Sequence, residues 1–280
     1  MNKQIRLDAF QNVANSGVAI NDLNKLLGTV LEKITLTLGG TFTRSMITAL
    51  QLKANGKVIW ETSGARLDLV NMYNGGSADV TILKLDFMDR RAVTVNARQA
   101  GALDLSAASG ITQLRMEVTI AGATNPTLVG FADVSPPVSD PAAGEAGIRF
   151  LIKRKHQATY VVGGAGEFAL PVPHLDPAGG GSNYSRICIY SANLTAIKTV
   201  RDGITEHELT KAQNEAAQKD NFKAPQSGLV VFDPVQTGTL MGNTWDTRKG
   251  VVGSATFYAS FSSGETITIE TEELIPLAAF

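Results

Sequence analysis

The chain has 280 residues, of which 44% are hydrophobic and 18% charged, and its 25 basic and 26 acidic residues leave a formal net charge of −1. A chain of this length and apolar content can bury roughly three quarters of its extended surface, which argues against bulk disorder. The near-neutral charge disfavours a dedicated nucleic-acid coat, and a single cysteine excludes both an intramolecular disulfide framework and a cysteine-rich zinc site.

The N-terminal segment, residues 1–31, contains the clearest amphipathic pattern. Its apolar residues at helical spacing are Leu23, Leu26, Leu27, Val30 and Leu31. The stripe predicts a helix over residues 21–33, with Asn21 as its N-cap. Packing on its own domain is the usual outcome for such a stripe, and contact with a membrane or a neighbouring subunit is the alternative.

Short apolar segments bounded by glycine and proline follow, which is typical of an all-β chain with many turns. None approaches the roughly 20 residues that span a bilayer. Asn55-Gly56 predicts a two-residue hairpin turn, because both residues tolerate positive φ. A short helix is predicted over residues 65–74, with Gly75 as its stop. The predicted strands of this half are residues 34–38, 47–52, 58–60, 80–87, 93–95, 103–105, 114–120 and 127–131.

A linker is predicted at the midpoint of the chain, because residues 134–147 carry three prolines and almost no large apolar residue. A helix is predicted over residues 205–219, with Thr205 and Glu208 as its capping box and Ile204 and Leu209 as a hydrophobic staple. The predicted strands of the second half are residues 160–162, 168–172, 187–190, 194–200, 229–232, 244–247, 255–261 and 266–271.

The two halves repeat one order of elements. Residues 45–133 and 185–272 each run as strand, turn, strand, helix, further strands and a closing hairpin. A repeat of this size indicates a duplicated β-sandwich, and seven or eight strands per copy is the count of a jelly roll. We predict an all-β fold of two tandem eight-stranded jelly rolls (a double jelly roll), each with a short helix, plus an N-terminal helical arm. The predicted domains are the arm at 1–31, a first jelly roll at 32–138, a linker at 139–148 and a second jelly roll at 149–280.

The sequence resembles the double jelly-roll major capsid proteins of tailless, membrane-containing double-stranded DNA bacteriophages of the corticovirus and tectivirus type, most closely the corticovirus type. The similarity is diffuse and covers most of residues 32–275. The segments that carry it are residues 51–74, 186–219 and 255–273.

The resemblance implies a structural shell protein without enzymatic activity. Its chains would trimerise into pseudo-hexagonal capsomers and tile an icosahedral virion shell over an internal membrane, after assembly in the host cytoplasm. The implied partners are other copies of the chain, the inner membrane, and penton, spike or minor capsid proteins, with no sequence-specific binding of nucleic acid. The resemblance implies no cofactor. It allows a structural calcium ion, but no spacing in this sequence assigns ligands to one. The candidate residues for membrane or lattice contact by the arm are Ile5, Leu7, Phe10, Leu23, Leu26 and Leu27.

Two other function classes are open. A tandem jelly-roll carbohydrate-binding or adhesin module would use exposed aromatic residues and calcium, but aromatic residues make up only 6% of the chain, and Trp60 and Trp245 lie in strand patterns. A metal-dependent enzyme of the cupin kind would need clustered histidines. His156, His174 and His207 are 18 and 33 residues apart in sequence, so we interpret them as surface histidines.

Other motifs have plainer interpretations. Residues 162–168 resemble a phosphate-binding glycine loop, but a strand pattern follows them where that motif needs a helix, so we predict a hairpin turn. The basic run at residues 153–156 favours a solvated turn over a phosphate contact. Residues 176–183 are predicted to form a flexible loop, and Cys188 a small buried residue within an apolar strand.

Overall fold

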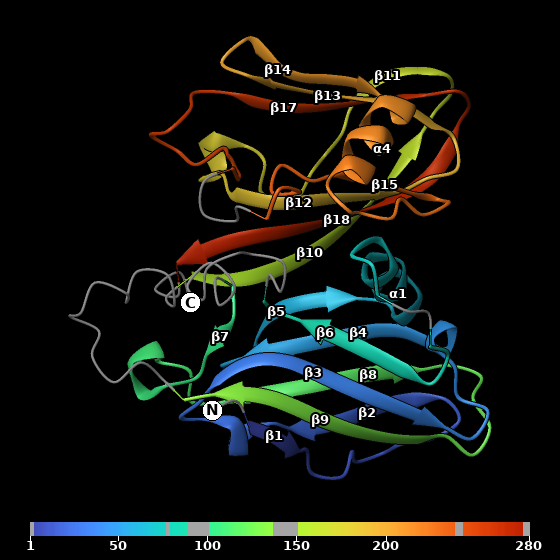
Figure 1. Ribbon diagram of the computed structural model, residues 1–280, viewed down its shortest axis with the longest axis vertical. Coiled ribbons are helices and arrows are strands. Elements are labelled where there is room, and N and C mark those ends of the chain that lie inside the picture. Colours follow the sequence, from blue (N-terminus) through green and yellow to red (C-terminus); the bar gives the residue numbers. More distant parts are fainter. Residues whose placement is uncertain (1–2, 77–78, 89–100, 137–150, 239–242, 277–280) are drawn as a thin grey trace. The chain divides into compact units, whose positions relative to one another are not determined.

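A computed structural model describes residues 3–76, 79–88, 101–136, 151–238 and 243–276 (Figure 1). The chain divides into two compact units. The boundary between Arg154 and Lys155 falls inside strand β10 (Leu151–Val162). The first unit comprises Met1–Met72, Gly76–Arg154 and Ile275–Phe280, and the second comprises Tyr73–Gly75 and Lys155–Leu274. The predicted linker at 139–148 and the predicted strand at 93–95 lie outside the described residues.

The first unit is a sandwich of two sheets. One sheet has the strand order β1-β9-β3-β6, with β7 also paired to β3, and the other has the order β2-β8-β4-β5. Alternate side chains of strands in both sheets point into one core, as in β8, where buried and half-buried residues alternate along the strand. The bounds are β1 (Lys3–Arg6), β2 (Gly17–Asp22), β3 (Val30–Gly39), β4 (Ile47–Ala54), β5 (Lys57–Thr62), β6 (Ile82–Asp86), β7 (Leu103–Asp104), β8 (Leu114–Ile120) and β9 (Thr127–Ser135).

The second unit repeats this arrangement strand for strand. Its sheets have the orders β10-β18-β12-β15, with β16 also paired to β12, and β11-β17-β13-β14. Adding nine to each strand number of the first unit gives both orders, so the predicted duplication of a jelly roll is confirmed at the level of topology. The remaining bounds are β11 (Gly166–Ala169), β12 (Asn183–Tyr190), β13 (Leu194–Arg201), β14 (Ile204–Thr210), β15 (Leu229–Phe232), β16 (Trp245–Asp246), β17 (Ala255–Phe261) and β18 (Glu265–Pro276).

Among the described residues, an α-helix occupies the same slot in each unit, α1 (Gly64–Tyr73) after β5 and α4 (Lys211–Asp220) after β14. The helix expected over residues 65–74 is confirmed. The equivalence of β4–β5 with β13–β14 corrects the predicted alignment of residues 45–133 with 185–272, which began one strand too early in the second copy.

The amphipathic helix predicted over residues 21–33 is wrong. Strand β2 runs to Asp22, a single 3-10 turn covers Asn24–Leu26, and β3 starts at Val30. Gly28 has a φ of +86°, a left-handed conformation that ends the helical path. Within residues 3–31, β1 and β2 pair antiparallel with β9 and β8, so these two strands belong to the sheets of the first unit.

The helix predicted over residues 205–219 begins later, at Lys211. Asp202 and Gly203 have φ values of +50° and +77°, which suit a two-residue hairpin turn, and β14 returns antiparallel along β13. The capping box is formed by Thr210 and Gln213, whereas the predicted box and staple residues lie in β14.

The glycine-rich stretch at 162–168 is a turn followed by a strand, as predicted, but not a hairpin. It connects β10 to β11, and these strands lie in opposite sheets of the second unit.

Replacing Gly181 by alanine is expected to destabilise the second unit. Gly181 has a φ of +65°, and a Cβ there would lie 2.0 Å from the Thr247 carbonyl oxygen, so the backbone would have to move. Gly203 is the matched control, because its φ is +77° but a Cβ there meets nothing within 4 Å. We expect Gly203→Ala to cost about 1–2 kcal/mol from backbone strain alone, and Gly181→Ala to cost more. Equal shifts of the two variants in urea denaturation would contradict the clash.

Candidate functional site

The arm residues singled out from the sequence lie in the first unit. Leu7, Phe10, Leu23 and Leu26 are buried in its core, and Ile5 and Leu27 pack against that core. The four buried side chains are therefore occupied within the first unit, whereas a lattice or membrane contact through the partly buried Ile5 and Leu27 stays a prediction.

The basic run at residues 153–156 is not a solvated turn. It lies within β10, where alternate side chains face opposite sides of the sheet. Lys155 is fully buried, and its Nζ lies 2.8 Å from Glu270 Oε2 of the neighbouring strand β18. Burial alone would lower the pKa of Lys155, but the carboxylates of Glu270 and Glu272 outweigh it and hold that pKa above its usual range.

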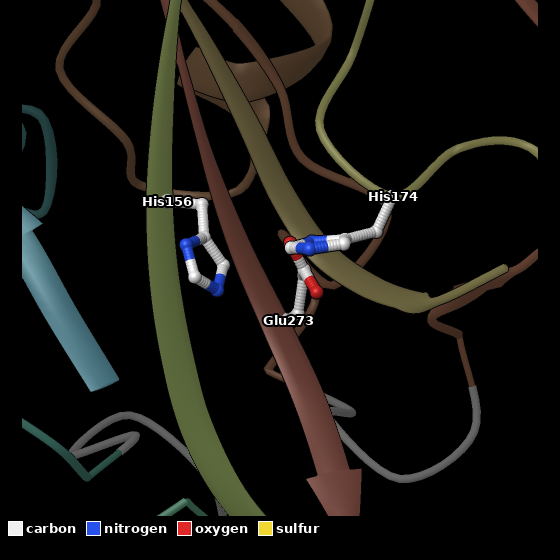
Figure 2. Close-up of side chains that lie close together, drawn as sticks. All are labelled: His156, His174 and Glu273. Carbon is white, nitrogen blue, oxygen red and sulfur yellow. The ribbon is translucent and has the colours of Figure 1, made fainter. Parts of the chain in front are cut away.

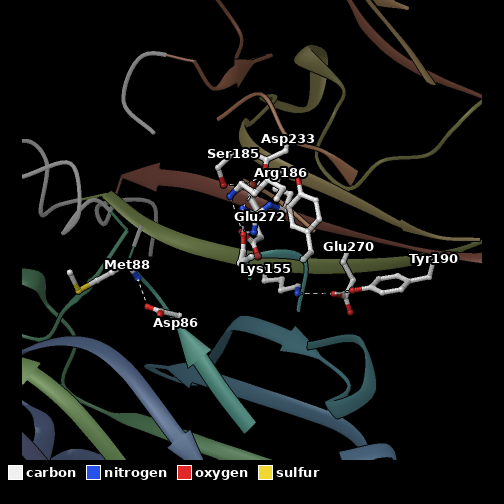
Figure 3. Close-up of polar contacts among 12 residues, drawn as sticks. Asp86, Met88, Lys155, Ser185, Arg186, Tyr190, Asp233, Glu270 and Glu272 are labelled. Carbon is white, nitrogen blue, oxygen red and sulfur yellow. Dashed lines mark hydrogen bonds and ion pairs between the residues drawn. The ribbon is translucent and has the colours of Figure 1, made fainter. Parts of the chain in front are cut away.

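Further ionic contacts continue from this pair along β12 and β18 (Figure 3). Arg186 contacts Glu272 Oε2 at 3.2 Å and Asp233 Oδ2 at 3.4 Å, and all three residues are buried. Tyr190 donates a hydrogen bond of 3.0 Å from its hydroxyl to Glu270 Oε2. The contacts of Arg186 and Tyr190 with Glu272 and Glu270 join β12 to β18, and the Arg186–Asp233 contact joins β12 to the residue after β15. All of them have the character of structural pairs.

Cys188 lies between these residues on β12 and is buried, as predicted. Burial raises the pKa of its thiol to about 12. The thiol is therefore protonated at neutral pH, which is typical of an unreactive structural cysteine.

Two of the three histidines meet in the second unit (Figure 2). His156 comes from β10, His174 from the segment between β11 and β12, and Glu273 from β18. Their candidate ligand atoms all lie within 4.8 Å of one another, and His174 Nδ1 lies 3.2 Å from Glu273 Oε1. The two imidazole rings pack edge to face, with centroids 4.6 Å apart.

The surroundings of this triad hold the carboxylate in place. The Glu273 side chain is fully buried, whereas the His174 side chain is 43% exposed. Ser182 Oγ donates to Glu273 Oε2 at 2.6 Å, and Thr271 Oγ1 donates to Glu273 Oε1 at 2.8 Å. Two imidazoles beside an oriented carboxylate form a donor set suited to a transition-metal ion.

Sequence reasoning missed this grouping, because strand pairing and a loop bring together residues up to 117 positions apart. His207 stands apart from it. It lies in β14, packs edge to face on Phe232 with centroids 5.2 Å apart, and burial lowers its pKa.

Comparison with protein families gives two matches that together span most of the chain. Residues 4–135 match the viral coat protein P2 N-terminal domain, and residues 152–277 match the viral coat protein P2 C-terminal domain. A comparison with curated protein sequences finds no match.

Comparison with solved structures shows the same fold in viral capsid proteins. The major capsid protein P2 of bacteriophage PM2 superposes with a TM-score of 0.82 at 19% identity, over 98% of this chain and 97% of that one. The STIV MCP gives a TM-score of 0.71 at 12% identity, over 99% and 97% of the two chains. The PBCV-1 virus capsid gives 0.63 at 9% identity, over 98% and 93%. Each of these similarities extends over both units.

Among the described residues, no helix has both the length and the apolar character needed to cross a membrane.

Proposed function

Because this chain belongs to the viral coat protein P2 family, we propose that it is a major capsid protein that acts as a homotrimer. Its membership in the family makes it a structural coat protein. The bacteriophage host type, the trimer, the icosahedral lattice and the underlying membrane are the proposed steps beyond that role.

The observation that carries the proposal is the strand-for-strand duplication of the jelly roll, with a coat-protein family match over each copy. Two similar rolls per chain supply six in a trimer, and six similar units approximate a hexagonal tile. A closed ring of three chains uses one heterologous interface repeated three times. A net charge of −1 lets many copies pack without large mutual repulsion.

Assembly rather than catalysis is the proposed mechanism. Obligate interfaces within a trimer bury on the order of 2,000 Å² or more, so the trimer would be the stable building block. Weaker contacts between trimers become effective because each trimer makes several of them at once in a closed shell. Localisation in the virion follows from this role.

Size-exclusion chromatography with light scattering tests the trimer. We expect a species of three times the chain mass of 29.6 kDa that persists on dilution to low micromolar concentration. A strictly monomeric protein at high concentration, with no larger species, would contradict the proposal.

Cryo-electron microscopy of particles from the native source tests the lattice and the membrane. We expect hexagonally arranged capsomers over a bilayer profile. Capsomers without a bilayer beneath them would contradict the membrane part and leave the coat role intact.

A further inference from the structure

We propose that His156, His174 and Glu273 bind a divalent transition-metal ion of the zinc type in the second unit (Figure 2). The three side chains come from β10, the β11–β12 segment and β18, so one ion would connect three separate stretches of the chain. The inference concerns this unit alone and does not depend on how the chain assembles.

The spacing of the donor atoms suits a small ion. Two ligands of one tetrahedral zinc ion, each bonded at about 2.0–2.1 Å, lie roughly 3.3 Å apart. His174 Nδ1 and Glu273 Oε1 are 3.2 Å apart, which matches this spacing. All donor atoms lie within 4.8 Å of one another, so a side-chain adjustment of about 1–2 Å at His156 would complete the set.

The carboxylate is held as a metal ligand requires. A carboxylate has about four lone-pair positions, and the hydroxyls of Ser182 and Thr271 occupy one on each oxygen of Glu273. Those hydroxyls fix the orientation of the carboxylate toward His174, whose Nδ1 lies 3.2 Å from Oε1. Oriented ligands of this kind are the usual outer shell of protein metal sites.

The loop that carries His174 is also fixed. His174 has a φ of +59°, a backbone conformation that costs of order 1 kcal/mol for a residue other than glycine. The adjacent Pro173 carbonyl accepts a hydrogen bond of 2.5 Å from the Tyr184 hydroxyl, and Tyr184 is the register partner of Glu273 across β12 and β18. The loop is therefore tied to the strand that carries the carboxylate.

The donor set selects the class of ion. Two imidazole nitrogens with one carboxylate oxygen suit Zn²⁺, Co²⁺, Ni²⁺, Cu²⁺ or Fe²⁺, whereas Ca²⁺ and Mg²⁺ prefer oxygen ligands throughout. Zn²⁺ and Co²⁺ are therefore the probes, and Ca²⁺ is the opposing probe.

The experiment uses the full-length protein after treatment with a chelator and its removal. We expect calorimetry to show one Zn²⁺ per chain, Co²⁺ to give visible absorption bands, and Zn²⁺ to raise the melting temperature by several degrees because it binds the folded state.

Two variants remove one ligand each. His174→Asn keeps a residue that tolerates positive φ, and His156→Gln keeps a polar side chain of similar reach. Each is expected to weaken Zn²⁺ binding by about 100-fold or more, since loss of an outer-shell partner alone costs about 10–100-fold.

His207→Gln is the matched control, because this histidine lies outside the triad, and it is expected to bind Zn²⁺ as the wild type does. Circular dichroism of each variant without metal checks that the fold is retained. A wild-type protein that does not bind Zn²⁺ would overturn the proposal. His174 and Glu273 would then be only a hydrogen-bonded histidine–carboxylate pair. Equal affinity in wild type and His174→Asn, or an equal stabilisation by Ca²⁺, would overturn it as well.

Discussion

Replacing Lys155 by methionine is expected to lower the free energy of unfolding by about 3–5 kcal/mol, because it leaves a buried carboxylate without its cation. Lys155 and Glu270 are both fully buried and 2.8 Å apart. The double variant Lys155→Met with Glu270→Gln should recover much of the loss, because it removes both charges. Urea denaturation at a fixed protein concentration measures both changes.

The matched control for this prediction is Lys198→Met. Lys198 pairs with Glu167 at 2.6 Å, but these side chains are 21% and 43% exposed. Exposed pairs contribute about 0–1 kcal/mol, so this variant should unfold nearly as the wild type does. A Lys155→Met protein as stable as Lys198→Met would show that the buried pair does not hold β10 to β18.

The Lys155 pair also predicts a direction of pH dependence. The folded-state pKa of Lys155 is raised, so its contribution is fully present below the unfolded pKa of about 10.4 and is lost as pH rises through the folded-state value. Between neutral pH and the alkaline range, Lys155→Met should therefore lose less stability than the wild type.

The second large effect is expected for Phe257→Ala, at about 3–5 kcal/mol. Phe257 is fully buried, and its ring packs edge to face on Phe232 and Trp245, with centroids 5.6 Å and 6.2 Å away. Truncation leaves a cavity between the two sheets of the second unit. Phe222→Ala is the matched control, because Phe222 is 83% exposed, and it should change stability by less than about 1 kcal/mol.

Fluorescence-monitored urea denaturation follows the Phe257 prediction through Trp245. Similar midpoints for Phe257→Ala and Phe222→Ala would show that the aromatic cluster is not the centre of this core.

Local signals in the sequence predicted the elements that depend on local chemistry. Asn55-Gly56 forms its left-handed turn, with φ values of +48° and +80°, and β8, β15 and β17 have the predicted bounds. The duplication was also visible, because each copy needs the same alternation of apolar residues and the same helix slot. The double jelly roll followed from these features together with the resemblance to a capsid family.

The errors occurred where long-range pairing decided between two local options. Leu23 and Leu26 have helical spacing, yet one 3-10 turn places both in the core, and the residues on either side join sheets. The sequence from Thr205 to Glu208 satisfies a capping box, yet β13 offers it a hairpin partner. The histidine–glutamate triad was not predictable, because it depends on β10 lying beside β18 and on a loop conformation that no local motif specifies.

The division of the chain has a consequence for the order of folding during synthesis. Ile275 is part of the hydrophobic core of the first unit, although it follows the whole second unit along the chain. The ribosome therefore releases this piece of the first core only after about 120 residues of the second unit have been made. The core of the first jelly roll therefore reaches its final packing late, after the second jelly roll has been translated.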